Sequence, residues 1–93
     1  MKASWNGVVI AQSDDTVLVD GNHYFPLDAL DRQYVTFSNH KTMCAWKGEA
    51  QYMSLIVDGN LLPDAAWTYV NPKPEAESVR NRVAFWKDVM VDA

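Results

Sequence analysis

The chain has 93 residues, of which 48% are hydrophobic, so it can form one small domain and is not a disordered segment. A chain of this length buries about two thirds of its unfolded surface, which supports a single core. Eight basic residues against twelve acidic ones give a net charge of −4, which disfavours a nucleic-acid partner. A single cysteine, Cys44, excludes an internal disulfide and a multi-cysteine zinc site.

The N-terminal segment carries no targeting or membrane signal. No apolar run approaches the ~20 residues needed to cross a bilayer, and Asn6-Gly7 interrupts the start too early for a signal peptide. We therefore expect a soluble, cytoplasmic protein with a reduced Cys44 and no membrane partner.

Glycine turns divide the first two thirds of the chain into short strands. Asn6-Gly7, Asp20-Gly21 and Asp58-Gly59 favour tight hairpin turns, because both central positions of such turns need positive φ. β-branched and aromatic residues flank these turns, which predicts an antiparallel β domain. A further turn at residues 12–15 should join two of the strands. The expected strands lie at residues 8–11, 16–19, 24–25, 52–57, 61–62 and 65–70.

Alternation along the strands predicts which side chains share a face. Ala65, Trp67 and Tyr69 are two residues apart and should point the same way. Residues 52–57 carry apolar groups on both faces, so this strand should be central and covered on both sides.

Helix is scarce in this sequence. Pro26 can begin a single turn, and Pro74, followed by Glu75 and Glu77, predicts one short helix near residues 75–81. Residues 83–86 and 89–91 then predict a closing hairpin around Lys87-Asp88.

No motif indicates a metal or a cofactor. Three of the four glycines belong to hairpin turns, and Lys47-Gly48 sits in no phosphate-binding pattern. His23 and His40 match no zinc spacing, and Cys44 lacks a second cysteine nearby. We therefore predict no bound metal and no cofactor.

Cys44 is the only residue that could act as a thiol nucleophile. A reactive thiol needs a nearby cation or helix start to lower its pKa. Lys47 lies three residues after it and His40 four residues before it. The alternative is that Cys44 is a buried small hydrophobe, as free cysteines usually are.

Aromatic residues suggest a binding face. Tyr52, Trp67 and Tyr69 recur on predicted strands near Trp46, and aromatic walls with a few polar groups are typical of small-ligand pockets. The same side chains could instead fill the core of a small β domain. Lys47 would flank such a pocket, or would be an exposed turn lysine.

Four blocks of the sequence resemble one family. They are Asn22–Pro26, residues 44–50 (Cys-Ala-Trp-Lys-Gly-Glu-Ala), residues 64–69 and residues 83–85. In their order and spacing they resemble the domain of unknown function 427 family over nearly the whole chain, residues 1–93. Ala45 departs from that family's pattern, which usually has proline there.

The resemblance implies a fold and a site. It implies a small single-domain antiparallel β-tent, in which two sheets meet at an angle, and it carries a catalogue label of nucleotidyltransferase for which this sequence shows no motif. The ligand-binding residues that it and the residue pattern suggest are His23, Tyr24, Ser38, Cys44, Trp46, Lys47, Tyr52, Trp67 and Tyr69.

Three functions follow as hypotheses. The first is the binding of an unknown small molecule in an aromatic-lined cleft. The second is group transfer, with Cys44 or Lys47 as the candidate catalytic residue. The third is a protein-interaction module that uses exposed strand edges, as a monomer or a homodimer.

Overall fold

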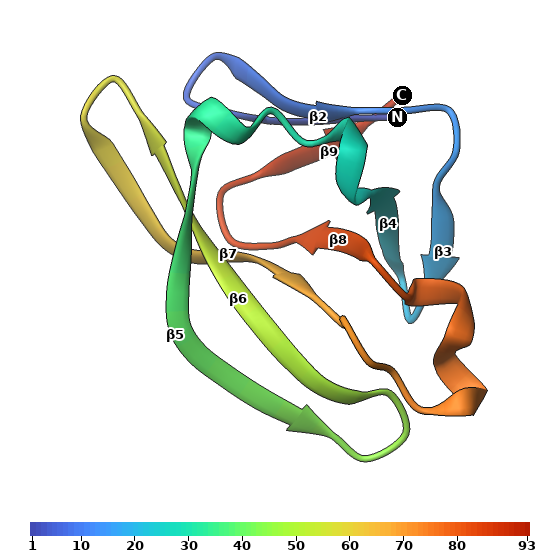
Figure 1. Cartoon of the computed structure of the whole chain (residues 1–93). Helices are drawn as coiled ribbons and strands as arrows, with labels where there is room; N and C mark the ends of the chain where they lie inside the picture. The colour runs from blue at the N-terminus through green and yellow to red at the C-terminus, as the bar shows by residue number, and fades with distance from the viewer.

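The computed structural model describes residues 1–93 and contains two antiparallel sheets that meet at an angle (Figure 1). The mainly-β prediction is therefore confirmed. One sheet has three strands in the order β2-β1-β9, and the other has six in the order β3-β4-β8-β7-β6-β5. The strands are β1 (Lys2–Trp5), β2 (Val8–Gln12), β3 (Val17–Val19), β4 (Asn22–Pro26), β5 (Val35–Cys44), β6 (Gly48–Val57), β7 (Asn60–Thr68), β8 (Arg82–Phe85) and β9 (Met90–Asp92).

Helix is limited to three short 3-10 segments: η1 (Leu27–Ala29), η2 (Arg32–Tyr34) and η3 (Pro74–Val79). The turn after Pro26 and the short helix near residues 75–81 are thus both present, the latter as η3, which begins at Pro74. None of these segments has the length and apolarity of a membrane-crossing helix.

The three predicted glycine turns adopt the expected backbone. Asn6 (φ 53°), Asp20 (φ 53°) and Asp58 (φ 51°) are each followed by a glycine with φ of 78–79°. Positive φ at both central positions gives the twist that two antiparallel strands need. These turns close the β1–β2, β3–β4 and β6–β7 hairpins.

The predicted closing hairpin over residues 83–91 is wrong. A turn does form there, since the N–H of Val89 donates to the carbonyl of Trp86 at 3.3 Å. The strands on either side of it nevertheless part, because β8 already has β4 on one edge and β7 on the other. β9 pairs instead with β1, which brings the two chain ends together (Figure 1).

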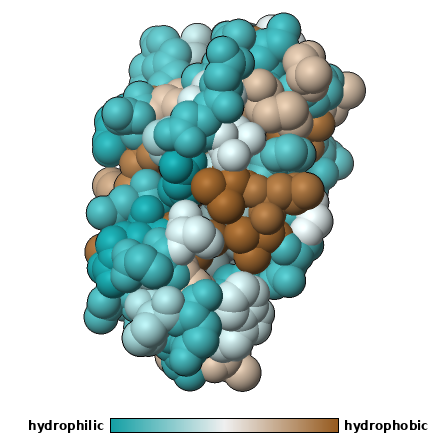
Figure 2. All heavy atoms as spheres, turned by 90° about the vertical axis from the view of Figure 1, so that its right-hand side faces the viewer, coloured by the Kyte–Doolittle hydropathy of each residue, from teal (hydrophilic) through white to brown (hydrophobic).

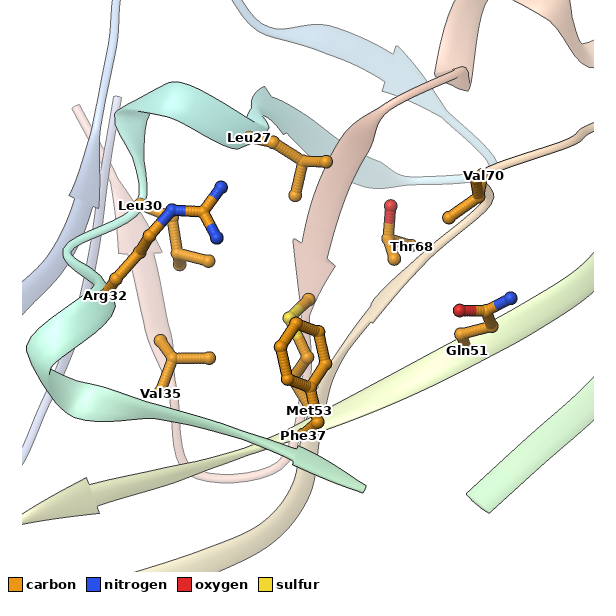
Figure 3. A pocket seen from close by; sticks show the side chains of 9 residues that line it. All are labelled: Leu27, Leu30, Arg32, Val35, Phe37, Gln51, Met53, Thr68 and Val70. Atoms are coloured by element: carbon orange, nitrogen blue, oxygen red, sulfur yellow. The ribbon is translucent and has the colours of Figure 1, made fainter. Parts of the chain in front are cut away.

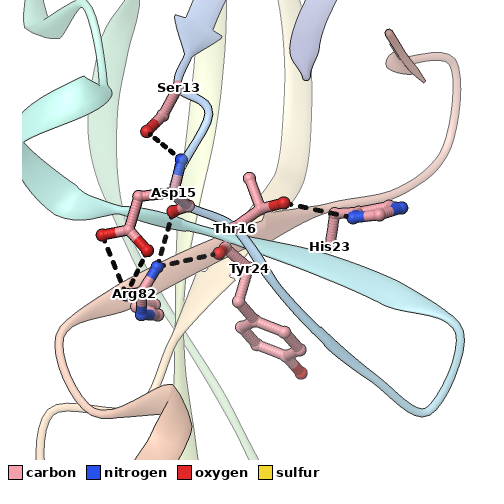
Figure 4. A network of polar contacts seen from close by, with 6 residues as sticks. All are labelled: Ser13, Asp15, Thr16, His23, Tyr24 and Arg82. Atoms are coloured by element: carbon pink, nitrogen blue, oxygen red, sulfur yellow. Dashed lines mark hydrogen bonds and ion pairs between the residues drawn. The ribbon is translucent and has the colours of Figure 1, made fainter.

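The connection at residues 12–15 passes from one sheet to the other. Arg82 of β8 holds it in place, donating to the carbonyl of Asp15 at 2.8 Å and to its carboxylate at 3.2 Å (Figure 4). The same guanidinium donates to the carbonyl of Tyr24 at 3.3 Å. One side chain thereby joins the corner of the chain to two strands of the six-stranded sheet.

Each face of the six-stranded sheet covers a separate group of buried residues. The larger core lies against the three-stranded sheet, where Ala3, Ile10 and Ala11 meet Leu55, Phe25 and their neighbours. The smaller core lies against η3, where Ala76 and Val79 pack with Tyr24, Trp67 and Tyr69. β6 lies between β5 and β7 and contributes to both cores, as its sequence predicted.

One sheet edge is also apolar on the outside. Figure 2 views the side of the molecule that carries β3 and shows an apolar patch ringed by hydrophilic residues. β3 is an edge strand of the larger sheet, and Leu18 at its centre is 61% exposed. β5, the other edge strand of this sheet, likewise carries exposed apolar residues, Phe37 (83%) and Met43 (70%).

Candidate functional site

The turn that follows Cys44 is held rigidly from two sides. Cys44 and Gly48 pair across the β5–β6 hairpin, and Gly48 has a φ of 110°, which favours glycine. The backbone N–H of Lys73 donates to the carbonyl of Lys47 at 2.8 Å, and its ammonium donates to the carbonyl of Ala45 at 2.6 Å. The loop before η3 therefore fixes the position of the whole turn.

Lys47 is buried and paired with an acid from a distant hairpin. Its residue is 7% exposed, and its Nζ lies 2.8 Å from the Asp20 carboxylate. Nζ also lies 5.3 Å from the ring centre of Trp46 and 5.8 Å from that of Tyr69. Burial lowers the pKa of Lys47, but the hydrogen bond to Asp20 and the nearby tyrosine hydroxyls outweigh this and raise it. The ammonium stays charged inside the site.

Cys44 has an acidified thiol. Burial raises the pKa of Cys44, but the backbone N–H groups of Lys47 and Trp46 and the charge of Lys47 together lower it below its ordinary value. The thiol is half-buried and remains open to solvent. Asp20 acts in the opposite direction, because its negative charge disfavours a thiolate.

Tyr69 stands on the other side of the ammonium. It is almost fully buried, and burial raises the pKa of its hydroxyl to about 12, although Lys47 opposes that shift. Cys44, Lys47 and Tyr69 are three of the five groups in the protein whose pKa values are shifted. The other two, Glu77 of η3 and Arg80 directly after it, form an exposed pair. We call the three residues, with Asp20 and Trp46, the Lys47 site.

An aromatic cluster adjoins the Lys47 site, with Trp67 at its centre. The ring of Trp67 lies 6.2 Å from that of Tyr24, 6.4 Å from that of Tyr52 and 6.3 Å from that of Trp86. The Trp67 indole N–H donates to the Tyr24 hydroxyl at 3.2 Å. Tyr24 and Trp67 are buried and fill the smaller core. This agrees with the alternative hypothesis that the aromatic residues pack in the core of the domain.

The open edge of this cluster lies at Tyr52. The Tyr52 ring is half-buried and lies 4.7 Å from that of exposed His40. Its hydroxyl lies 3.1 Å from that of Thr42. Trp46 is 41% exposed beside the Lys47 ammonium. Aromatic surface is thus available to solvent at the β5–β6 hairpin.

Two of the predicted residues lie at the margins. His23 Nδ1 lies 3.4 Å from the hydroxyl of Thr16, and its side chain points away from that of Tyr24 (Figure 4). Ser38 lies where the β5–β6 pairing is irregular, and its hydroxyl accepts the N–H of His40 at 3.0 Å. Ser38 therefore supports the residue whose ring lies against that of Tyr52.

Three participants were missed by the sequence reasoning. Asp20 was predicted only as a turn residue, yet its carboxylate pairs with Lys47. Lys73 carries no signal of its own in the sequence, and Trp86 was predicted in a hairpin that does not form. Only the tertiary fold brings these residues to the site, so no local signal could have identified them.

A cavity lies on the opposite face of the same strands. It has a volume of about 450 Å³, and none of the nine predicted ligand-binding residues lines it. Elsewhere, no group of three or more His, Cys, Asp or Glu side chains converges as metal ligands would.

Comparison with known families gives one match. Residues 1–93 match the family model NTP_transf_9, described as a domain of unknown function (DUF427). The chain belongs to this family. No curated protein matches it. Family membership confirms the resemblance seen in the sequence blocks and leaves the activity of the domain to be inferred from its site.

The charges of Lys47 and Asp20 should shift the pKa of the Cys44 thiol in opposite directions. Lys47→Gln should raise the pKa of the Cys44 thiol, and Asp20→Asn should lower it, because the two native charges act in opposite directions. Asparagine tolerates the positive φ of Asp20, so the turn is kept. The pH dependence of alkylation by iodoacetamide reports on this single cysteine. If both substitutions shift the pKa of Cys44 in the same direction, and both variants keep the circular dichroism of the wild type, this placement of the two charges beside the thiol is wrong.

Tyr69 makes a prediction about alkaline stability. An unfolded tyrosine ionises near pH ~10, whereas the folded Tyr69 has a pKa of about 12. Within this window the unfolded chain releases a proton that the folded chain keeps, so the free energy of unfolding falls as pH rises. Tyr69→Phe should match the wild type at pH ~7 and lose less stability between pH ~10 and ~12 in urea titrations. If the free energy of unfolding falls equally with pH in the wild type and in Tyr69→Phe, the prediction is wrong.

Proposed function

We propose that this domain binds a small molecule on the surface formed by Trp46, Tyr52 and Cys44, above the buried ammonium of Lys47. The observation that supports this proposal is the gathering of three groups with shifted pKa values beside the exposed ring of Trp46 and the half-buried ring of Tyr52. Shifted pKa values concentrate at functional sites. Exposed ion pairs also shift pKa values, but here two of the three residues are buried.

The surroundings favour a planar ligand with a polar edge. Trp46 and Tyr52 offer ring area for contact with a planar ligand, and the His40 ring already lies against that of Tyr52, tilted by 54° with the ring centres 4.7 Å apart. The polar edge would meet the Cys44 thiol and the N–H groups of the turn. Lys47 is committed to Asp20 at 2.8 Å, so its charge acts on the ligand from below rather than as a free hydrogen-bond donor.

A reduced thiol is part of this proposal, which places the protein in a reducing compartment such as the cytoplasm. A monomer is sufficient for this binding, because Trp46, Tyr52 and Cys44 all belong to one chain. The edge of β3, with Leu18 exposed, is the surface on which a homodimer would form.

A screen of planar heteroaromatic compounds by thermal shift, followed by calorimetry on the hits, tests the proposal. Trp46→Ala should weaken the hits about tenfold, as loss of a buried stacking face does. Lys47→Gln should change their pH dependence. Met90→Ala is the control, because Met90 is an exposed apolar residue (65%) on the three-stranded sheet, belongs to neither site, and should leave affinity unchanged. Equal affinity for all three variants and the wild type rules out this surface.

The second candidate function is group transfer at Cys44, which the lowered pKa of its thiol favours. The family model's name, NTP_transf_9, points to nucleotidyl transfer. In that reaction the thiolate would attack the α-phosphorus of a nucleoside triphosphate, and a sulfur–phosphorus bond would form while pyrophosphate leaves with the electron pair. A hydroxyl acceptor would then displace the thiolate and release its proton to water.

Mass spectrometry tests this second candidate directly. After incubation with nucleoside triphosphates and Mg²⁺, wild-type protein should gain one nucleoside monophosphate on Cys44, and Cys44→Ser should gain none. For Lys47 to contact a phosphate, its ion pair with Asp20 must open, so Asp20→Asn should increase the yield of adduct. Absence of an adduct with all four common nucleotides removes the candidate.

A further inference from the structure

The cavity of about 450 Å³ opens between the η1–η2 segment and the face of β5, β6 and β7 (Figure 3). Its volume is within the range of small-molecule sites. The cross-strand pairs Gln51–Thr68 and Tyr52–Trp67 occupy successive positions of β6 and β7. Successive side chains of a strand point to opposite faces, so the cavity and the aromatic cluster lie back to back on the same two strands.

The walls of the cavity are mainly apolar. Leu27 begins η1 and Leu30 directly follows it, while Val35 begins β5 and Met53 lies in β6 (Figure 3). Leu30 and Met53 are also members of the larger core, so the cavity is a continuation of that core toward the surface. Phe37 stands at its rim with 83% of its surface exposed. An aromatic side chain exposed to this degree has apolar area that a ligand could cover.

Arg32 is the cation of this cavity, and it has no partner within the chain. Six of the eight basic side chains are engaged in ion pairs or in hydrogen bonds to carbonyls. Lys2 and Arg32 are the two that are not, and only Arg32 borders the cavity. Its neighbour Asp31 accepts hydrogen bonds from Gln33 instead. An unpaired guanidinium at an apolar opening is suited to a carboxylate.

The other polar side chains that line the cavity, those of Thr68 and Gln51, carry no charge. The Thr68 hydroxyl is used, since it donates to the carbonyl of Arg82 at 2.8 Å. The Gln51 amide has no partner in the chain and lies at the end of the cavity away from Arg32 (Figure 3). No acidic side chain lines the cavity. Charge therefore favours an anion at the Arg32 end and a neutral, apolar body between the two ends.

We propose that this cavity binds a medium-chain monocarboxylate, with the carboxylate paired to Arg32 and the hydrocarbon body between Leu30, Met53 and Phe37. The occupant is a free small molecule rather than a lipid in a bilayer, because only one cation borders the opening and the net charge of the protein is −4. This site shares no residue with the Lys47 site and does not depend on the function proposed there.

Calorimetry and amide chemical shifts with octanoate test the proposal, with octanol as the uncharged ligand of equal chain length and acetate as the ligand without an apolar body. Octanoate should bind saturably, about tenfold more tightly than octanol, since charge-assisted hydrogen bonds are stronger than neutral ones. Acetate should not bind. Arg32→Gln, at an exposed position, should reduce octanoate affinity to that of octanol.

Two further variants separate this site from the Lys47 site. Phe37→Ala should weaken octanoate and octanol alike, whereas Trp46→Ala should weaken neither. Val70→Trp, at a residue that is 48% exposed, should fill the end of the cavity that lies away from Arg32 and weaken binding of both ligands. Octanoate binding that survives Arg32→Gln unchanged, or that is lost on Trp46→Ala, would overturn the proposal. Binding only to phosphatidylglycerol vesicles, with none to octanoate, would overturn it equally.

Discussion

The alternation of side chains along β6 and β7 governs the arrangement of this domain. Tyr52 pairs with Trp67 on one face, and Gln51 pairs with Thr68 on the other. Because one pair follows the other directly, a register shift of one residue would exchange the two faces. The first face is closed by η3 and becomes the aromatic cluster, while the second meets the three-stranded sheet and remains open at the η1–η2 end. The aromatic cluster and the cavity are therefore placed on opposite faces by this pairing.

The ion pair between Lys47 and Asp20 is hard to explain by stability alone. Removing an ammonium from water is costly, and replacing buried ion pairs with apolar residues is often neutral or stabilising. Here the pair ties the β3–β4 turn to the β5–β6 turn and keeps a positive charge close to Cys44 and Tyr69. A methionine could fill the same volume, but it could not lower the pKa of the thiol. Only the Lys47 end of the pair is buried, since the Asp20 side chain is 55% exposed, so the pair joins the two turns while it remains partly in contact with solvent.

What the sequence predicted was local, and what it missed was long-range. The turn at Asp20-Gly21 could be predicted because positive φ is a property of two neighbouring residues. The pairing of Asp20 with Lys47 joins residues of two separate hairpins, so no local pattern carries it. The closing hairpin failed for a related reason, since β8 had no free edge left for β9. The cavity is lined by residues of five elements, η1, η2, β5, β6 and β7, which no local sequence pattern brings together.

Lys47 and Arg32 differ in burial and in ion pairing, so the two proposed sites should prefer different ligands. Lys47 is buried and already neutralised by Asp20, so an anion would have to displace a carboxylate in order to reach it. Arg32 is exposed and has no acidic partner, so an anion can pair with it at little desolvation cost. Anion binding is therefore more favourable at the cavity, whereas the Lys47 site is better suited to stacking and thiol chemistry. Because the sites lie on opposite faces of one strand pair, substitutions at exposed positions can test each site separately.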